Sequence, residues 1–232
     1  VPIEAADLNK IKALSGLCAS KATTYLIASA GMITDREGVI SAAIVTSSPK
    51  QVEVYTADDT NPTLASWVLD MNANKIYLTF SEAVVKSTLT ANQFQLQSLA
   101  NSGTSGATVK SLSVSTVADE VSNQPEQLTL TLHADDVNAI KLVTNFGLTL
   151  SNTFISFPSG AVADTLSKAV DAIASTGAKA AASIVPDTTK PQLSTFTLNM
   201  DTQKLILTFN EVVKASSIDP TKITIQEAAS AG

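Results

Sequence analysis

Hydrophobic and polar residues alternate along residues 64–80, on both sides of a short polar turn at Asn72–Asn74. Every second position before the turn and again after it is apolar: Trp67, Leu69, Met71, Ile76, Leu78 and Phe80. Alternation with a period of two on both sides of a short turn is typical of paired antiparallel strands with one buried face. The pattern therefore predicts a hairpin that packs one face into a core.

The same pattern returns later in the chain, at Phe196, Leu198, Met200, Leu205, Leu207 and Phe209. The shift that aligns Pro62 with Pro191 pairs 103 positions without any gap, of which 27 are identical. An internal repeat of this strength sets the domain organisation. We expect residues 1–57 to be the C-terminal part of one unit, 58–186 a complete unit and 187–232 the N-terminal part of the next, as in a segment of a longer tandem array.

Other stretches of the unit carry the signals of one helix and several more strands. Apolar residues three or four apart behind an aspartate predict a short amphipathic helix over residues 5–17, and again over 134–146. Further strands are expected at residues 23–29, 152–158, 93–97, 109–117 and 127–132. The Ala-rich stretch before residue 186 suits a spacer or an edge strand. Each unit would then hold about seven short strands and one helix.

Composition and charge exclude two classes of binding partner, nucleic acids and the interior of a membrane. The net charge is -6, and Arg36 is the only arginine, so the bidentate contacts with phosphate and guanine that nucleic-acid readers use are nearly absent. No apolar run approaches the roughly 18 residues that a membrane-spanning helix needs. The sequence thus predicts no nucleic-acid partner and no membrane span in this segment.

The side chains that nucleophilic catalysis and zinc binding require are almost absent from the sequence. His133 is the only histidine and aligns with Glu4, so the two copies share no Ser-His-Asp relay. Cys18 is the only cysteine and lies far from His133 in the repeat, so we expect no zinc site. We expect His133 to have a structural role near the start of a helix. Cys18 is expected to be either a buried free thiol or half of an intermolecular disulfide bridge. The prediction is a protein that is not an enzyme and needs no cofactor.

Carboxylates are the remaining candidates for site chemistry. They lie near strand ends and loops: Asp58, Asp59, Glu82, Asp135, Asp136, Asp164, Asp187 and Glu211. Calcium takes oxygen ligands from such groups and would stiffen the joints between units, although no spaced calcium-loop motif is present. The alternative is that these acids are solvated or cap helices.

The boundary between units is marked by a polar turn that ends in proline. The predicted linker residues are Asp58, Thr60, Pro62, Asp187, Thr189 and Pro191. Proline disfavours helical conformation in the residue before it, so each boundary should enter the next strand in an extended conformation.

The boundary and the hairpin together resemble a bacterial-type Ig-like repeat. That family opens with Asp-Thr-Thr-Pro-Pro and continues into Leu-Thr-Phe-Ser-Glu before a Ser-rich turn. Matching positions here are Pro62, Leu78–Phe80, Glu82, Ser87, Pro191, Leu207–Phe209, Glu211 and Ser216. Such repeats occur in surface-layer proteins, giant secreted adhesins and long extracellular repeat proteins of protists. The resemblance implies a mainly β fold of tandem Ig-like antiparallel β-sandwich domains, each with one short inserted α-helix.

The expected function is structural and extracellular. The resemblance and the repeat suggest a segment of a filament, a flagellar hair or a cell-surface layer, whose partners are copies of itself along and across the assembly. The alternative is a stalk or glycan-binding module of a secreted adhesin, stiffened by calcium. Glycan binding would need exposed aromatic side chains, whereas Trp67 and Phe196 fall at positions predicted to be buried.

Overall fold

The computed structural model describes residues 1–229 and has a mainly β fold with two short α-helices in that range. The chain forms two compact units, Val1–Asp187 and Thr188–Gly232. The first unit contains the complete copy of the repeat together with the residues that precede it. The second unit contains the start of the next copy.

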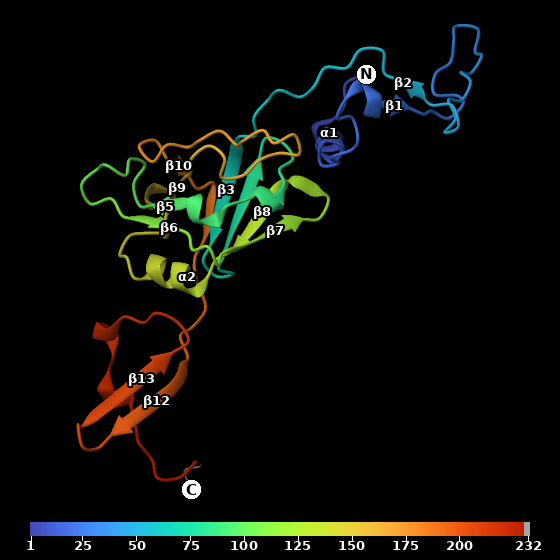
Figure 1. Ribbon diagram of the computed structural model, residues 1–232. Helices are drawn as coiled ribbons and strands as arrows, with labels where there is room; N and C mark the ends of the chain where they lie inside the picture. Colours follow the sequence, from blue (N-terminus) through green and yellow to red (C-terminus); the bar gives the residue numbers. More distant parts are fainter. Residues whose placement is uncertain (230–232) are drawn as a thin grey trace. The chain divides into compact units, whose positions relative to one another are not determined.

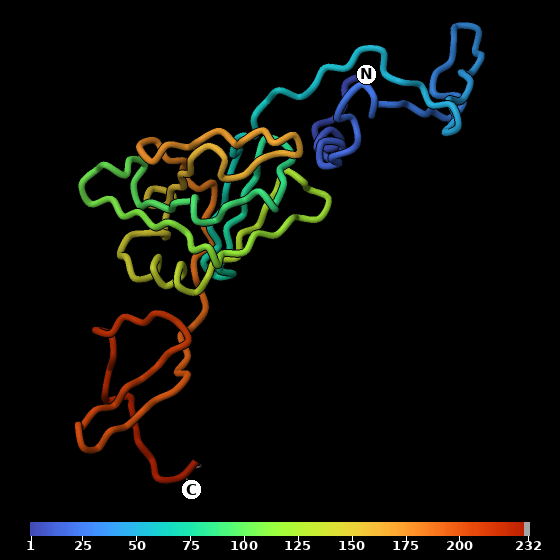
Figure 2. The backbone as a smooth tube through the Cα atoms, viewed as in Figure 1, coloured from blue at the N-terminus to red at the C-terminus, as the bar shows by residue number. Residues whose placement is uncertain are grey.

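The complete copy consists of two β-sheets, whose course is followed in Figures 1 and 2. In spatial order, the larger sheet contains β11 (Ser183–Val185), β3 (Leu64–Asp70), β4 (Lys75–Phe80), β8 (Gln124–Thr131) and β7 (Val117–Val121). The smaller sheet contains β10 (Lys179–Ala180), β9 (Phe154–Ser156), β5 (Gln95–Gln97) and β6 (Val109–Ser111). All neighbours pair antiparallel except β11 and β3, which pair in parallel.

The two sheets share one hydrophobic core, which confirms the hairpin predicted from the alternating pattern. Strands β3 and β4 bury every second side chain, and Trp67, Leu69 and Leu78 have no exposed surface. The smaller sheet adds Leu96 and Ile155 to the same cluster. Cross-strand burial of this kind is the main source of stability of a small antiparallel fold.

Both predicted helices form, but they are shorter than expected. Helix α1 spans Ala5–Lys12 and α2 spans Ala134–Lys141, so the last turn of each prediction is wrong. In the complete copy the chain leaves the helix through left-handed conformations at Asn145 and Gly147, which a right-handed helix cannot accommodate. Short 3-10 helices complete the structure at Lys21–Thr23, Lys86–Thr88, Ala91–Gln93, Leu150–Asn152, Ala215–Ser217 and Pro220–Lys222.

The predicted strand over residues 109–117 is interrupted, and β6 and β7 replace it. The Asp136 carboxylate accepts hydrogen bonds from the Ser113 amide and the Thr116 hydroxyl, which draws the intervening backbone toward α2 and away from both sheets. The complete copy therefore has nine strands where about seven were expected. The Ala-rich stretch ends in edge strand β11, which decides between the two alternatives left by the sequence.

Residues 1–57 repeat the second half of the complete copy. Strand β1 (Tyr25–Leu26) pairs with β2 (Lys50–Gln51) in the same register as their counterparts β9 and β10. Asp35 accepts hydrogen bonds from the amides two and four residues later, as does its counterpart Asp164. The sequence repeat is thus also a repeat of local structure.

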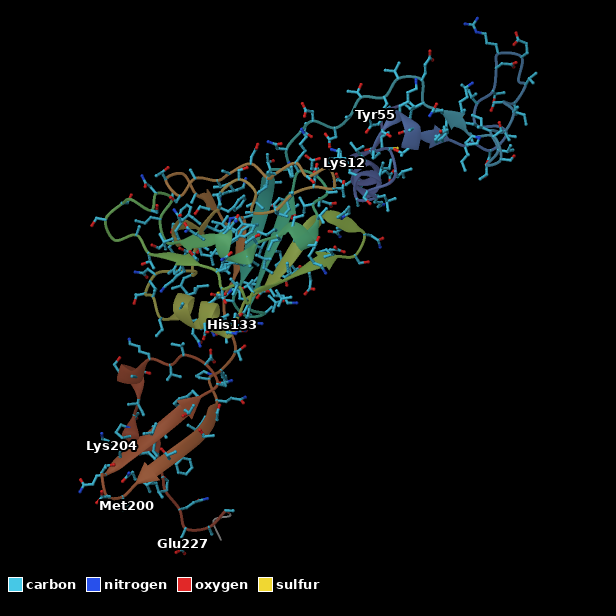
Figure 3. All side chains as sticks on the ribbon, viewed as in Figure 1. Lys12, Tyr55, His133, Met200, Lys204 and Glu227 are labelled. Carbon is cyan, nitrogen blue, oxygen red and sulfur yellow. The ribbon has the colours of Figure 1, made fainter. Side chains whose placement is uncertain are left out.

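The second unit repeats the hairpin of the complete copy. Strand β12 (Leu193–Asn199) pairs with β13 (Lys204–Phe209), and the register shift near its start matches that of β3 and β4. Met200 and Lys204 flank the hairpin turn (Figure 3). The predicted burial of Phe196 is wrong, because 58% of this side chain is exposed while its counterpart Trp67 is buried. Residues 188–229 contain no second sheet that covers this face.

Gly147 is a position where the fold depends on the absence of a side chain. Its φ is +69°, and a Cβ there would lie 2.8 Å from Cγ2 of Ile140. We expect Gly147→Ala to lower the free energy of unfolding by roughly 2–3 kcal/mol, since backbone strain and crowding add. Gly160→Ala is the control, because Gly160 also has a positive φ but no atom within 4 Å of the added Cβ. Equal losses in denaturant titrations would contradict the crowding argument.

Candidate functional site

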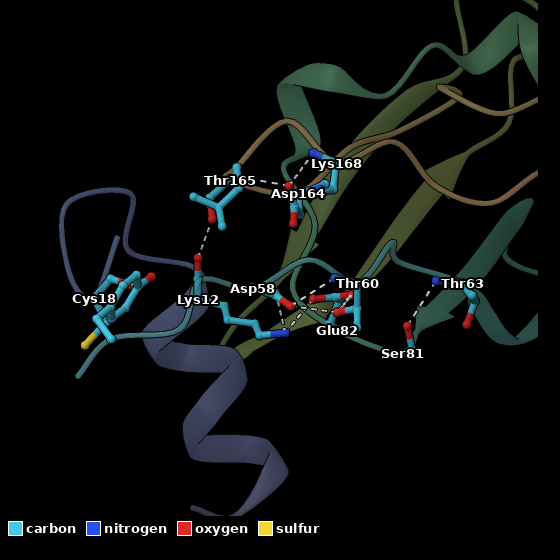
Figure 4. A network of polar contacts seen from close by, with 12 residues as sticks. Lys12, Cys18, Asp58, Thr60, Thr63, Ser81, Glu82, Asp164, Thr165 and Lys168 are labelled. Atoms are coloured by element: carbon cyan, nitrogen blue, oxygen red, sulfur yellow. Dashed lines mark hydrogen bonds and ion pairs between the residues drawn. The ribbon is translucent and has the colours of Figure 1, made fainter. Parts of the chain in front are cut away.

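A lysine at the end of α1 joins residues 1–57 to the complete copy. The Lys12 Nζ lies 2.6 Å from Asp58 Oδ2 and 2.6 Å from Glu82 Oε2 (Figure 4). Asp58 belongs to the predicted linker, and Glu82 follows β4 in the complete copy. Only 22% of the Lys12 side chain and 6% of the Glu82 side chain are exposed, so the ionic contact is largely removed from water. We call Lys12, Asp58 and Glu82 the junction triad.

Hydrogen bonds around the junction triad hold its members in place. The Thr60 hydroxyl donates to Asp58 Oδ1 at 2.7 Å. The Thr165 hydroxyl donates to the Lys12 carbonyl oxygen at 2.6 Å, which satisfies one of the free carbonyls at the end of α1. Lys168 forms an ion pair with Asp59. Three parts of the chain, the helix, the linker and the loop after Asp164, therefore meet at this point.

The shifted pKa values of the junction triad follow from this geometry. Burial raises the pKa of Asp58, but hydrogen bonds from Lys12 and Thr60 outweigh it and bring the pKa to about 2. For Glu82 burial is the largest influence and raises the pKa, although Lys12 opposes it. Burial lowers the pKa of Lys12, but the two carboxylates raise it overall. Of the two carboxylates, Glu82 is therefore the one that protonates first as the pH falls.

Every member of the junction triad is identical in the second copy of the repeat. Lys12, Asp58 and Glu82 correspond to Lys141, Asp187 and Glu211, and only about a quarter of all paired positions are identical. Lys141 Nζ lies 2.6 Å from Asp187 Oδ2, so the contact between helix and linker recurs in the first unit. The contact between helix and linker is therefore part of the repeat itself.

The predicted linker residues have different roles. Asp58 and Asp187 bind the helix lysines, and Thr60 bonds to Asp58. Pro62 is buried and lies two residues before β3. Thr189 and Pro191 lie in the second unit, ahead of β12. The sequence prediction did not include Lys12 or Lys141. Their identity across the repeat would have revealed them, since the neighbouring Lys10 corresponds to Ala139.

Acid should weaken the junction triad, because protonation of Asp58 removes its charge. The low pKa of Asp58 in the folded state means that its contribution is present above the unfolded value near 3.8 and is lost as the pH falls through about 2. We expect Asp58→Asn to remove roughly 2 kcal/mol of stability at pH 6 and little near pH 2.

Glu82 has the opposite pH dependence, because its pKa is raised in the folded state. Its protonation stabilises the folded state at a pH below the pKa of the unfolded state, and this contribution is lost as the pH rises through the pKa of the folded state. Denaturant titrations of Glu82→Gln beside Asp58→Asn separate the two contributions. A loss in Asp58→Asn that is the same at pH 2 and pH 6 would contradict the assignment.

The carboxylates expected to hold calcium are brought together only in part. Carboxylate oxygens of Asp58, Glu82 and Asp164 lie within 4.8 Å of one another, and the described residues hold no other such group. The ammonium of Lys12 already contacts two of these carboxylates. Asp136 instead accepts hydrogen bonds from residues 113 and 116, and Asp59 pairs with Lys168.

Because Lys12 supplies the positive charge between Asp58 and Glu82, a divalent cation has to displace an ammonium to bind there. We therefore expect the melting temperature to be the same in EDTA and in millimolar calcium. Lys12→Met should be the variant that gains sensitivity to calcium, since it leaves the carboxylates uncompensated. A calcium-dependent rise in the melting temperature of the unmodified chain would contradict this reading.

The residues considered for catalysis are placed in structural roles or apart from one another. His133 caps α2, and its Nδ1 accepts a hydrogen bond from the Asp135 amide at 3.3 Å. Cys18 is half-buried, and its carbonyl oxygen accepts a hydrogen bond from the Tyr55 hydroxyl. Within the described residues no helix has the length and apolar character to cross a bilayer.

Comparisons with known proteins find two solved structures with low TM-scores. No family model matches the chain, and no curated protein matches it. Among solved structures it is similar to the S-layer protein rSbsC(31-844), with a TM-score of 0.32, 17% identity, and coverage of 61% of this chain and 16% of that one. It is also similar to domains 1-6 of the surface layer protein SbsC, with a TM-score of 0.33, 16% identity, and coverage of 65% and 18%. The chain thus spans less than a fifth of either structure.

Proposed function

We propose that this chain is part of a cell-surface structural protein in which β units follow one another in tandem and are held at fixed joints. The observation that carries the proposal is the junction triad. A partly buried lysine in one copy binds the linker and the following copy, and all three residues of the triad recur at the matching positions of the next copy. Such a contact restricts the movement of one copy relative to the next. An ordered assembly needs this restriction, because its units must meet at a constant angle, whereas a flexible chain of domains does not.

The Ig-like resemblance fits this proposal. Two of its motif residues lie close to the joint, because Pro62 precedes β3 and Glu82 belongs to the junction triad. Each copy would form a sandwich of two sheets, and copies would associate along and across an extracellular filament or layer. The proposed boundaries between copies remain residues 57/58 and 186/187, and no enzymatic activity is assigned.

The glycan-binding alternative has weaker support. It needs an exposed aromatic surface that the copies share, but Trp67 is fully buried and donates its indole N–H to the Lys179 carbonyl oxygen. Its exposed counterpart Phe196 lies on a strand whose matching face forms the core of the complete copy. We therefore assign Phe196 to packing between parts of the assembly.

Two measurements test the proposal together. Immunogold labelling of the producing cells should place the protein at the cell surface. Negative-stain microscopy of the purified chain, with light scattering over a range of concentrations, should reveal ordered assemblies. Labelling confined to the cell interior, or a chain that stays monomeric at every concentration, would reject the structural role.

A further inference from the structure

The junction triad holds an amine and two carboxyl groups in contact at a place largely closed to water. Lys12 Nζ lies 2.6 Å from Asp58 Oδ2 and 2.6 Å from Glu82 Oε2, and carboxylate oxygens of Asp58 and Glu82 lie within 4.8 Å of each other (Figure 4). The exposed fraction of the side chain is 22% for Lys12, 20% for Asp58 and 6% for Glu82. This is the starting geometry of a condensation, in which an amine and a carboxyl group join as an amide and release water.

Two features separate this contact from an ordinary ion pair at the surface. An exposed lysine and aspartate do not condense, because water stabilises both ions and the two groups meet only briefly. In the junction triad the hydration of both ions is restricted, and the reacting groups are held in permanent contact. The raised pKa of Lys12 and the low pKa of Asp58 make the ion pair the state before reaction. The ammonium must therefore lose a proton before it can attack, and Glu82 lies beside it to accept that proton.

We propose that Lys12 and Asp58 form an amide bond within the chain, with Glu82 as the group that transfers the protons. The Lys12 ammonium gives a proton to Glu82, and the freed lone pair of Nζ attacks Cγ of Asp58. The Nζ–Cγ bond forms, the Cγ–Oδ2 bond breaks, and Oδ2 leaves as water with the two protons that the ammonium has lost. Glu82 ends in its initial state, and no oxidant, reductant or cofactor takes part.

Thr60 is placed to stabilise the intermediate of this reaction. Asp58 Oδ1 accepts hydrogen bonds from the Thr60 hydroxyl at 2.7 Å and from the Thr60 amide at 3.3 Å. Negative charge develops on Oδ1 when Nζ bonds to Cγ, and donors that already point at this oxygen lower the barrier. Oδ1 then becomes the carbonyl oxygen of the amide, while Oδ2, which faces Lys12, is the oxygen that leaves.

The residues that this reaction needs are identical in the second copy of the repeat. Lys12, Asp58, Thr60 and Glu82 correspond to Lys141, Asp187, Thr189 and Glu211. Lys141 Nζ again lies 2.6 Å from Asp187 Oδ2, whereas the neighbouring Lys10 corresponds to Ala139. We therefore expect a second amide bond between Lys141 and Asp187, so that the cross-link recurs with the repeat.

The bond would make the joint permanent. Neither Lys12 nor Asp58 then carries a charge, and the pH dependence of the triad belongs to the chain before it reacts. The bond closes a loop over residues 12–58 and restricts the unfolded chain, as a disulfide does. The cross-link goes beyond the proposed function, because it can form whether or not copies assemble. Mass spectrometry detects the bond and light scattering detects assembly, so either proposal can fail without the other.

Mass spectrometry of the full chain tests the proposal. After incubation at neutral pH, the intact mass should lie below that of the sequence by one water for each bond. Digestion should release a peptide in which residues around Lys12 are joined to residues around Asp58. Lys12→Met should abolish this joined peptide, and Lys10→Met, on the same helix, is the matched control that keeps it. Circular dichroism checks that both variants fold.

Glu82→Gln separates proton transfer from positioning, because glutamine keeps the shape of the side chain but cannot carry the proton. The joined peptide should appear roughly a hundredfold or more slowly in this variant, and Glu82→Asp should restore part of the rate. Equal rates in Glu82→Gln and the unmodified chain would overturn the mechanism.

Two other results would reject the bond itself. One is an intact mass that equals the sequence mass after prolonged incubation. The other is a loss of water that persists in Lys12→Met, since a cyclic imide at an aspartate gives the same mass without joining two peptides. If the bond is absent but the chain forms ordered assemblies, the proposed function stands and only the cross-link is wrong.

Discussion

Lys12→Met is expected to lower the free energy of unfolding of the first unit by roughly 2–4 kcal/mol. The substitution keeps the length of the side chain but leaves Asp58 and Glu82 without their shared cation in a largely buried position. Removing one partner of a buried ion pair costs more than the pair contributes, because the remaining charge is desolvated. Denaturant titration measures the loss, and limited proteolysis should show faster cleavage within residues 56–62.

Lys10→Met is the matched control for this prediction. Lys10 lies on the same helix, 54% of its side chain is exposed, and its nearest carboxylate oxygen, on Asp7, is 3.6 Å away. An exposed pair of this kind contributes little, so we expect a change below about 0.5 kcal/mol. Adding Glu82→Gln to Lys12→Met should recover part of the loss, because it removes the uncompensated charge. Equal effects of Lys10→Met and Lys12→Met would contradict the role of the junction triad.

Trp67→Ala should have the largest effect of any single truncation in the complete copy. The indole is fully buried between the sheets, and its N–H donates to the Lys179 carbonyl oxygen at 3.0 Å. Loss of its packing and the cavity left behind should lower the free energy of unfolding by about 3–5 kcal/mol. Denaturant titration at low protein concentration measures this loss in the free chain.

Phe196→Ala tests the same position in the other copy. Because Phe196 is mostly exposed, its truncation should change stability in the dilute chain by about 0.5 kcal/mol or less. The same variant should weaken assembly at high concentration, because we assign Phe196 to packing between parts of the assembly. A loss in the dilute chain as large as that of Trp67→Ala would mean that the face is already buried there.

Periodicity in the sequence was sufficient to predict the hairpin and both helices. Alternation at Trp67, Leu69 and Leu78 reports burial on one face of a strand, and the local chemistry of Asp35 and Asp164 marks matching loops. These features depend on residues close together in the chain. Sequence patterns carry such information well, because side-chain spacing and backbone geometry are linked directly.

Features that depend on distant partners were missed. Phe196 has the pattern of a core residue, but burial requires a covering segment that residues 188–229 do not contain. The parallel strand β11 follows an Ala-rich stretch with no alternation of its own.

From the sequence alone, Lys12 resembles an ordinary solvated lysine in the last turn of a helix. A positive charge is favourable there without any partner. Its two carboxylates belong to distant parts of the chain, the linker and the segment that follows β4. Only the comparison of the two copies distinguishes Lys12 from Lys10.

We propose that tandem units joined at fixed angles form an ordered assembly at the cell surface. Negative-stain microscopy of the purified chain at increasing concentration, with Lys12→Met beside it, tests this most directly. The unmodified chain should give assemblies with a regular axial spacing, and the variant should lose that regularity. Isolated particles at every concentration, or equally ordered assemblies from Lys12→Met, would contradict it.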